Sequence, residues 1–171
     1  IQSNHQLESN EEKLKKKTGG RKVHTTLAFV HTYPDGDRDF SFYRNPGADM
    51  MLRKEEVSLE KICASKIFHF GTLSFTHAGI RTASQYAIQC AKEAGALISF
   101  DPNLREPLWE NLEDARKAIE YGMECCDILK ISDNELTFMT GEKDYDKGAV
   151  LLQQKYQIPL VCVTLGKDGS R

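Results

Sequence analysis

The chain has 171 residues, of which 40% are hydrophobic, and its 23 basic and 25 acidic residues leave a formal net charge of −2. A chain of this size can bury enough apolar surface for one folded domain. The near balance of charge excludes the basic footprint of a nucleic-acid-binding protein, so we expect a small-molecule substrate. No signal-peptide pattern opens the sequence and no apolar run reaches the roughly 18 residues of a membrane span, so we expect no membrane partner.

The five cysteines show no spacing typical of a zinc site. The adjacent pair Cys125 and Cys126 fits a reducing compartment better than a disulfide framework. We therefore expect a cytoplasmic protein.

Residues 1–22 differ in composition from the rest of the chain. Residues 11–17 form a charged run that is followed by Thr18-Gly19-Gly20, with few apolar side chains to bury. We expect a flexible segment, and a contact of the three lysines at 15–17 with phosphate or nucleic acid is the less favoured interpretation.

Residues 26–44 have the pattern of a β-hairpin. Leu27 and Phe29, and then Phe40 and Phe42, are spaced by two residues on either side of the turn-rich stretch 33–38. A hairpin alone is marginal in water, so it has to cover something else. The sequence predicts a lid.

The remainder alternates short apolar runs with helical periodicity, which predicts an α/β fold with a parallel sheet flanked by helices. Gly95 is placed to end one helix and Asn111 to cap the next. We expect three parts: a flexible or atypical segment 1–22, a lid 23–50, and an α/β domain 51–171. Strands are expected near 66–70, 96–100, 127–131 and 160–164, and helices near 76–94, 111–124, 133–140 and 145–156.

Polar residues follow each of the four expected strands. Because the carboxyl ends of parallel strands share one edge, these segments predict a ligand-binding rim, although each alone fits a turn or a helix cap. The segments are Gly71-Thr72, 101–105, 132–135 and 164–169.

The chemistry that such a rim supports is phosphoryl transfer, in which a protein positions the reactants and neutralises charge. Arg105 can offer its planar fork to a phosphate or a sugar hydroxyl, and Glu135 can hold Mg²⁺ through water. Arg105 can equally well pair with Asp101 and brace the loop. Gly166 and Gly169 allow a nucleotide to approach the backbone, which is a weak signal. The sequence contains neither G-x-x-x-x-G-K-[ST] nor G-x-G-x-x-G, so classical P-loop and Rossmann nucleotide sites are excluded.

Five segments together resemble the ribokinase-like (PfkB) carbohydrate kinases, fructokinases in particular, over roughly residues 24–171 and in the family's order. They are 26–30, 42–50, 101–105, 132–135 and 163–169. The resemblance implies a Rossmann-like α/β domain with a β-lid that also forms a homodimer. It implies transfer of the γ-phosphate of ATP to a sugar hydroxyl, with D-fructose giving fructose 6-phosphate as the first choice, and with Mg²⁺ and K⁺ as candidate cofactors.

The resemblance also assigns binding roles to nine residues. Sugar binding falls to Tyr43, Arg44, Asp101, Asn103 and Arg105, magnesium binding to Glu135, and nucleotide binding to Thr164, Gly166 and Gly169, while Arg105 also supports the transferred phosphate.

The sequence departs from the family pattern in three places. Ser132 stands where many relatives have Asn, and the family's N-terminal Gly-Gly segment and its G-A-G-D motif are not found; residues 46–49 are only an echo of the latter. In the family that motif supplies the general base, typically worth about 10²–10⁴-fold in rate, and an anion hole. We therefore expect no catalytic base in this chain, very low activity of the chain alone, and one poorly covered sheet face after the last strand.

Two other classes of function stay open. One is a non-catalytic sugar- or nucleotide-binding protein derived from such kinases, and the other is a structural subunit that contributes its hairpin to a dimer. Within the kinase hypothesis, 2-keto-3-deoxygluconate and ribosides are the alternative substrates.

Overall fold

The structure is a computed structural model that describes residues 23–34, 36 and 38–171, so the segment 1–22 that the sequence predicts to be flexible lies outside the described residues. The chain divides into two compact units, Ile1–Leu52 and Arg53–Arg171. In the described residues no helix is both long and apolar enough to cross a membrane.

The first unit contains the predicted hairpin. Strands β1 (Leu27–Thr32) and β2 (Arg38–Tyr43) pair antiparallel. The Gly36 amide donates to the carbonyl of Tyr33 at 3.0 Å and helps to close the turn. After β2 the chain continues into a short 3₁₀ helix, η1 (Ala48–Met51).

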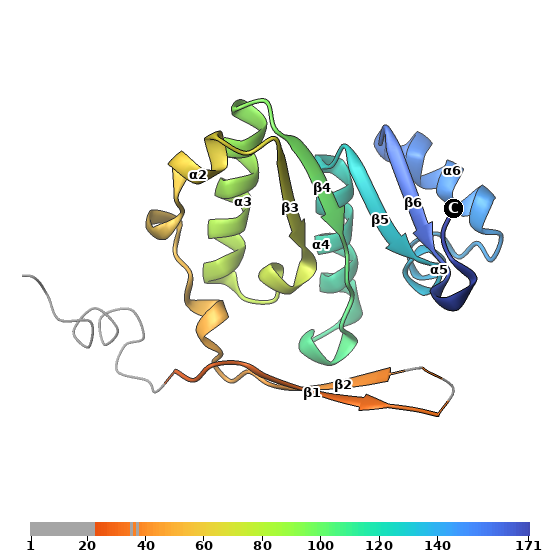
Figure 1. The fold of residues 1–171 in the computed structure, drawn as a ribbon, viewed down its shortest axis with the longest axis horizontal. Helices are drawn as coiled ribbons and strands as arrows, with labels where there is room; N and C mark the ends of the chain where they lie inside the picture. Colours follow the sequence, from red (N-terminus) through yellow and green to blue (C-terminus); the bar gives the residue numbers. More distant parts are fainter. Residues whose placement is uncertain (1–22, 35, 37) are drawn as a thin grey trace, which may run out of the picture. The chain divides into compact units, whose positions relative to one another are not determined.

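The second unit is built on a four-stranded parallel sheet in the order β3-β4-β5-β6 (Figure 1). The predicted alternation of strands and helices is confirmed, with element ends that differ by at most two residues from the expected ones. The strands are β3 (Ile67–Gly71), β4 (Leu97–Asp101), β5 (Ile128–Ser132) and β6 (Leu160–Thr164). The helices are α2 (Leu59–Cys63), α3 (Ala78–Glu93), α4 (Leu112–Cys125), α5 (Asp133–Thr140) and α6 (Tyr145–Tyr156), with 3₁₀ turns η2 (Lys54–Glu56), η3 (Thr72–Phe75), η4 (Glu106–Leu108) and η5 (Gly166–Asp168).

Both helix-end signals that the sequence offered are present. The Asn111 side chain accepts a hydrogen bond from the Asp114 amide at 2.8 Å and so caps α4. Gly95 follows α3 with φ of +79°, a left-handed conformation that favours glycine and stops the helix.

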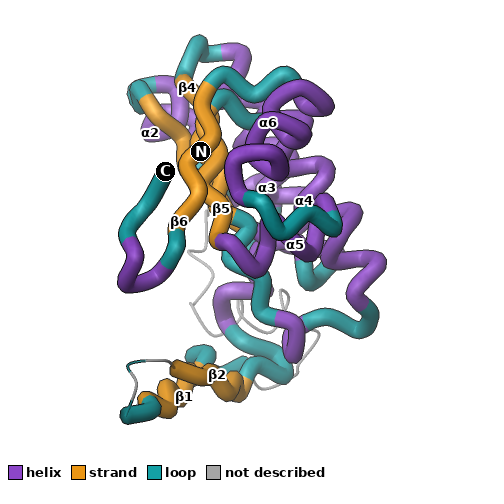
Figure 2. Tube along the Cα trace, turned by 90° about the vertical axis from the view of Figure 1, so that its right-hand side faces the viewer, coloured by secondary structure: helices purple, strands orange, loops and turns teal. Residues whose placement is uncertain are grey.

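The core lies between the sheet and one layer of helices. Figure 2 shows α3, α4, α5 and α6 together on one side of the sheet. The strand side chains that point to this side, such as Ile98, Phe100 and Leu129, are fully buried. Alternate residues point to the other face, where Ile67 and Leu97 remain 54% and 50% exposed.

The parallel register brings the carboxyl ends of the strands to one edge. Gly71 pairs with Asp101, and Ser132 pairs with Thr164. A Cβ at Gly71 would lie only 2.7 Å from the Asp101 carbonyl oxygen, so glycine permits the close approach of β3 and β4 at this edge. We call this edge, with the loops that leave it, the rim.

Gly122→Ala should destabilise the second unit by about 1–2 kcal/mol. Alanine is the better helix former by roughly 1 kcal/mol, but a Cβ at this position would run into the buried ring of Phe100, and overpacking typically costs about 1–3 kcal/mol. Urea unfolding followed by circular dichroism measures the change.

Phe100→Leu provides the control because it removes the ring that Gly122→Ala would meet. The cost of Gly122→Ala should shrink in that background. An equal cost in both backgrounds would show that the ring contact does not require this glycine.

Candidate functional site

Residues 101–105 begin with the last residue of β4 and continue into the loop that follows, and their first residue holds the segment in shape. The Asp101 carboxylate forms an ion pair with Lys130 Nζ at 3.0 Å and accepts the Asn103 amide at 3.1 Å. Asn103 has φ of +46°, a left-handed conformation that asparagine tolerates in turns. We call residues 101–105 the rim loop.

The sequence left open whether Arg105 pairs with Asp101 to brace this loop; in the structure the ion-pair partner of Asp101 is Lys130. Asp101 pairs with Lys130 of the neighbouring strand β5, and this contact braces the loop. Arg105 instead donates from Nη1 to the Leu104 carbonyl at 3.1 Å, within the rim loop itself.

A second contact fixes the rim loop on the β3 side. The carbonyl of Pro102 accepts two hydrogen bonds from Thr72, one from its amide at 3.1 Å and one from its hydroxyl at 2.6 Å. Thr72 is fully buried, so its hydroxyl needs this partner. The rim loop is therefore tied to β5 through Lys130 and to η3, which follows β3, through Thr72.

Glu135 makes the third contact with the rim loop. Its carboxylate, in a residue that is 7% exposed, accepts the Leu104 amide at 2.7 Å on Oε1. On Oε2 it accepts the Ser132 amide at 2.9 Å and the Ser132 hydroxyl at 2.8 Å. Ser132 and Glu135 form a capping box at the start of α5.

The carboxylates at the rim do not fit a directly bound magnesium ion. Glu135 has three protein donors on its two oxygens, and Asp101 holds a lysine and an amide. Among the described residues there is no group of three or more His, Cys, Asp or Glu side chains placed to hold a metal. Mg²⁺ prefers several unshared oxygen ligands in an octahedron, which this set does not offer.

The predicted nucleotide loop is a tight turn after β6. The Leu165 amide donates to the Gly169 carbonyl at 2.8 Å, and residues beyond the turn pair back along β6. Gly166 and Gly169 have φ of +57° and +90°, so the turn itself favours glycine at both positions. A Cβ on either residue would meet nothing within 4 Å, which leaves the backbone accessible.

Tyr43 and Arg44 belong to the first unit. The Arg44 guanidinium is engaged by Asp49, with Nε at 2.8 Å and Nη2 at 2.6 Å from Oδ2, and the Thr26 hydroxyl donates to the other carboxylate oxygen. Burial raises the pKa of Asp49, but the hydrogen bonds from Arg44 and Thr26 and the charge of Arg44 outweigh it, so this pKa lies below its ordinary value. Arg44 therefore fastens the base of the hairpin, whatever else it contacts.

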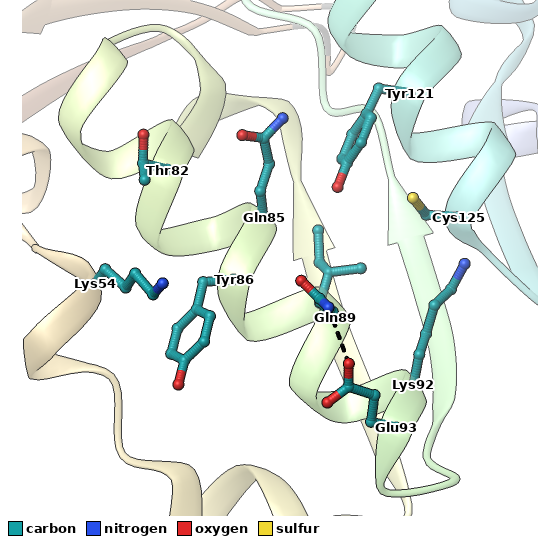
Figure 3. Close-up of a pocket in the computed structure, with 10 residues that line it drawn as sticks. Lys54, Thr82, Gln85, Tyr86, Gln89, Lys92, Glu93, Tyr121 and Cys125 are labelled. Atoms are coloured by element: carbon teal, nitrogen blue, oxygen red, sulfur yellow. Dashed lines mark hydrogen bonds between the residues drawn. The ribbon is translucent and has the colours of Figure 1, made fainter.

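A groove of about 460 Å³ lies on the helix layer between α3 and α4 (Figure 3). Lys54 Nζ lies 4.4 Å from the centre of the Tyr86 ring, and Tyr121 and Cys125 line the opposite side. Burial, together with the neighbouring Cys125, raises the pKa of Tyr121 to about 12, so its hydroxyl stays neutral. The lining residues come from η2, α3 and α4, and none comes from the rim.

Sequence reasoning missed three of the contacts that build the rim. The Ser132-x-x-Glu135 pattern is a recognisable capping box and was available as a signal. Lys130 lies within a strand, and Thr72 follows one, so nothing in their spacing marks them as partners of a loop some 30 residues away.

The sequence matches the pfkB family carbohydrate kinase profile over residues 14–171. The chain belongs to the pfkB family of carbohydrate kinases. The parallel α/β sheet, the separate antiparallel hairpin and the order of the rim segments agree with this membership.

Curated relatives of this pfkB-family chain include plant fructokinases. It is 49% identical over 147 residues to probable fructokinase-2 of Arabidopsis thaliana, covering 86% of this chain and 45% of the relative. It is 45% identical over 145 residues to fructokinase-2 of Solanum lycopersicum, covering 85% and 44%. The chain thus spans less than half the length of these relatives.

Solved structures of pfkB-type kinases share the fold. Fructokinase from Xylella fastidiosa with bound ATP is 35% identical, with a TM-score of 0.67, and the match covers 81% of this chain and 43% of that one. Fructokinase from Vibrio cholerae O395, solved as a double mutant with fructose, ADP and potassium, is 30% identical with a TM-score of 0.71, covering 84% and 46%. The predicted ribokinase-like α/β fold is therefore confirmed for this pfkB-family chain.

The carboxylate of Asp49 should titrate with a midpoint below about 3.9, the ordinary value for aspartate. Because the folded-state pKa is lowered, the ionised group stabilises the hairpin base in full above its ordinary, unfolded-state pKa. This stabilisation is lost as the pH falls through the folded-state pKa. Carbon-detected NMR measures the midpoint, and the amide signals of β1 and β2 should move together with it.

Asp49→Asn should shift the same amide signals at pH values above the folded-state pKa of Asp49, because there it removes the charge that Arg44 faces. Asp39→Asn is the matched control, since the Asp39 carboxylate accepts the adjacent Phe40 amide. A midpoint at or above the ordinary value would contradict the network at the hairpin base.

Proposed function

We propose that the protein containing this chain is an ATP-dependent fructokinase, which transfers the γ-phosphate of ATP to a hydroxyl of D-fructose to give fructose 6-phosphate. The observation that carries the proposal is the rim loop, fixed by three separate contacts at the carboxyl edge of a parallel sheet, in a chain of a sugar kinase family. The fructokinase names of the relatives support fructose over other sugars.

In this proposal the rim loop presents two groups to the reactants. The Asn103 carboxamide makes no hydrogen bond within the described part of the chain, so it can serve a sugar hydroxyl. Arg105 can place its fork on the phosphate oxygens, where a charge-assisted pair neutralises the charge that develops during transfer. Asp101 holds the loop in shape through Lys130 and the Asn103 amide.

The nucleotide in this proposal lies beside the turn formed by Thr164, Gly166 and Gly169. The accessible backbone of both glycines supports this placement. Magnesium arrives with the nucleotide, bound to phosphate oxygens, which agrees with the engaged carboxylates of the rim. The Vibrio cholerae fructokinase was solved with a potassium ion bound, which makes K⁺ a candidate for this chain as well.

We also propose a cytoplasmic location. All five cysteines are unpaired, which suits a reducing compartment. The Arabidopsis relative named probable fructokinase-6, chloroplastic, makes the plastid the alternative.

The test of this function uses a complete kinase, because the chain spans less than half of its relatives. A chimera in which this chain replaces the matching segment of the tomato fructokinase supplies every group that lies outside the chain. Magnesium-dependent ADP release should be fastest with fructose, compared with glucose, ribose and 2-keto-3-deoxygluconate. Arg105→Ala should lower kcat by roughly 10²–10³-fold, as expected for loss of one donor to developing charge.

Lys117→Ala is the control for this variant, since Lys117 is an exposed cation on α4 whose ion pair with Asp114 is a surface contact. A chimera that prefers another of the four sugars would reject fructose as the substrate. Nucleotide binding without turnover on any sugar would support the non-catalytic alternative.

We further propose that the hairpin is a lid whose two faces have different partners. Leu27, Phe29 and Tyr43 share one face by register, whereas Val30, Phe40 and Phe42 share the other. Phe29 is 62% and Val30 53% exposed, so each face offers apolar surface. Because Tyr43 is the proposed sugar contact, the face with Val30 and Phe42 is assigned to a second copy of the chain.

Val30→Asp and Phe42→Asp should therefore convert a dimer into a monomer in sedimentation velocity. Phe29→Asp, on the face of Tyr43, is the matched variant, and it should leave the dimer intact while weakening sugar binding. Dissociation by Phe29→Asp with no effect of Val30→Asp would reverse the assignment of the faces.

A further inference from the structure

The Glu135 carboxylate joins two parts of the second unit that are far apart in sequence. Its Oε1 atom accepts the amide of Leu104, which is 31 residues away in the rim loop. Its Oε2 atom accepts two donors of Ser132, at the junction of β5 and α5. The side chain therefore acts as a bridge between the loop after β4 and the end of the next strand.

These bonds use most of what a carboxylate can accept. An ionised carboxylate has about four lone-pair positions, and three are taken by protein donors at 2.7–2.9 Å. The one position left is on Oε1, beside the Leu104 donor. A metal ion that coordinated both oxygens would have to displace a protein donor, and one that used Oε1 alone would share that oxygen with the Leu104 amide in a residue that is only 7% exposed.

The position of Leu104 links this bridge to the residues that are proposed to bind the reactants. Leu104 lies between Asn103 and Arg105, the two rim-loop residues assigned to the sugar and the phosphate. The other two anchors, Thr72 on Pro102 and Lys130 on Asp101, lie at the start of the loop. Glu135 holds the second half of the loop, through the Leu104 amide.

We infer that Glu135 is a positioning residue, which holds Leu104 and thereby sets the places of Asn103 and Arg105, and that it is not a ligand of the catalytic metal. The inference rests on the proposed function for the roles of Asn103 and Arg105. The bridge itself is a property of the fold and can be tested without turnover.

Glu135→Gln keeps the size of the side chain but replaces one acceptor oxygen by an amide group. The remaining oxygen can serve either Leu104 or Ser132, and the new NH₂ group faces a donor on the other side. Because the half-buried Leu104 amide loses its charged acceptor, its signal should move upfield and its hydrogen exchange should become roughly tenfold faster or more.

The experiment records ¹H–¹⁵N NMR spectra and amide exchange for the full chain and two variants. Asp133→Asn is the matched control, because Asp133 lies at the same helix start and its carboxylate accepts the adjacent Asn134 amide. Asp133→Asn should leave the chemical shift and the hydrogen exchange of the Leu104 amide unchanged. If Glu135→Gln does not fold, Glu135→Asp replaces it, since one methylene less prevents the side chain from reaching Leu104 and should produce the same loss.

A second arm uses the wild-type chain with MgCl₂ and ADP. A positioning residue keeps its partner, so the Leu104 amide should retain its shift and its protection at every magnesium concentration. Loss of protection on adding magnesium would show that Glu135 moves to the metal and would overturn the inference.

An unchanged Leu104 amide in Glu135→Gln would overturn it as well. Neither readout depends on a sugar, so failure of the fructokinase proposal would appear in the chimera assay and failure of the bridge would appear here.

Discussion

The hydrogen bond between the Leu104 amide and the buried Glu135 carboxylate is the interaction on which the candidate site depends. A buried carboxylate requires hydrogen-bond donors. Glu135 has them in the Leu104 amide, in the loop after β4, and in the Ser132 amide, at the end of the neighbouring strand β5. The same bond that satisfies the carboxylate gives the rim loop a fixed conformation. The Glu135 side chain thus both stabilises the fold here and sets the conformation of the rim loop.

This arrangement is possible because the strands are parallel and lie in the sheet in the order in which they follow along the chain. Parallel pairing places the carboxyl ends of β4 and β5 side by side, so that a side chain at the start of α5 can reach the loop after β4. The close approach at Gly71 and the buried hydroxyl of Thr72 fasten the loop from the opposite side. A fixed loop at this edge suits the function proposed for the protein, because phosphoryl transfer is catalysed largely by positioning and charge.

Much of this fold could be predicted from the sequence, because periodicity and helix-end chemistry are local. The alternation of strands and helices, the Asn111 cap, the Gly95 stop and the hairpin follow from patterns within a few residues. The segments that gather at the rim also follow from the sequence, since the topology of a parallel sheet places them there.

The contacts that give those segments their shape are harder to predict. Lys130 on Asp101 and Thr72 on Pro102 connect residues about 30 positions apart, and no local pattern distinguishes them from other strand or turn residues. Glu135 was assigned to magnesium on family resemblance, whereas its donors engage it within the fold. Arg44 was assigned to the sugar, and its contact with Asp49 depends on how the hairpin closes at its base.

The most direct test of this account is a hydrogen-exchange footprint of the chain with ATP and fructose added together and separately. The account predicts protection of residues 101–105 and 132–135 by the sugar with ATP, and of 164–169 by ATP. Protection confined to the helix-layer groove, around Tyr86 and Tyr121, with an unchanged rim would contradict it.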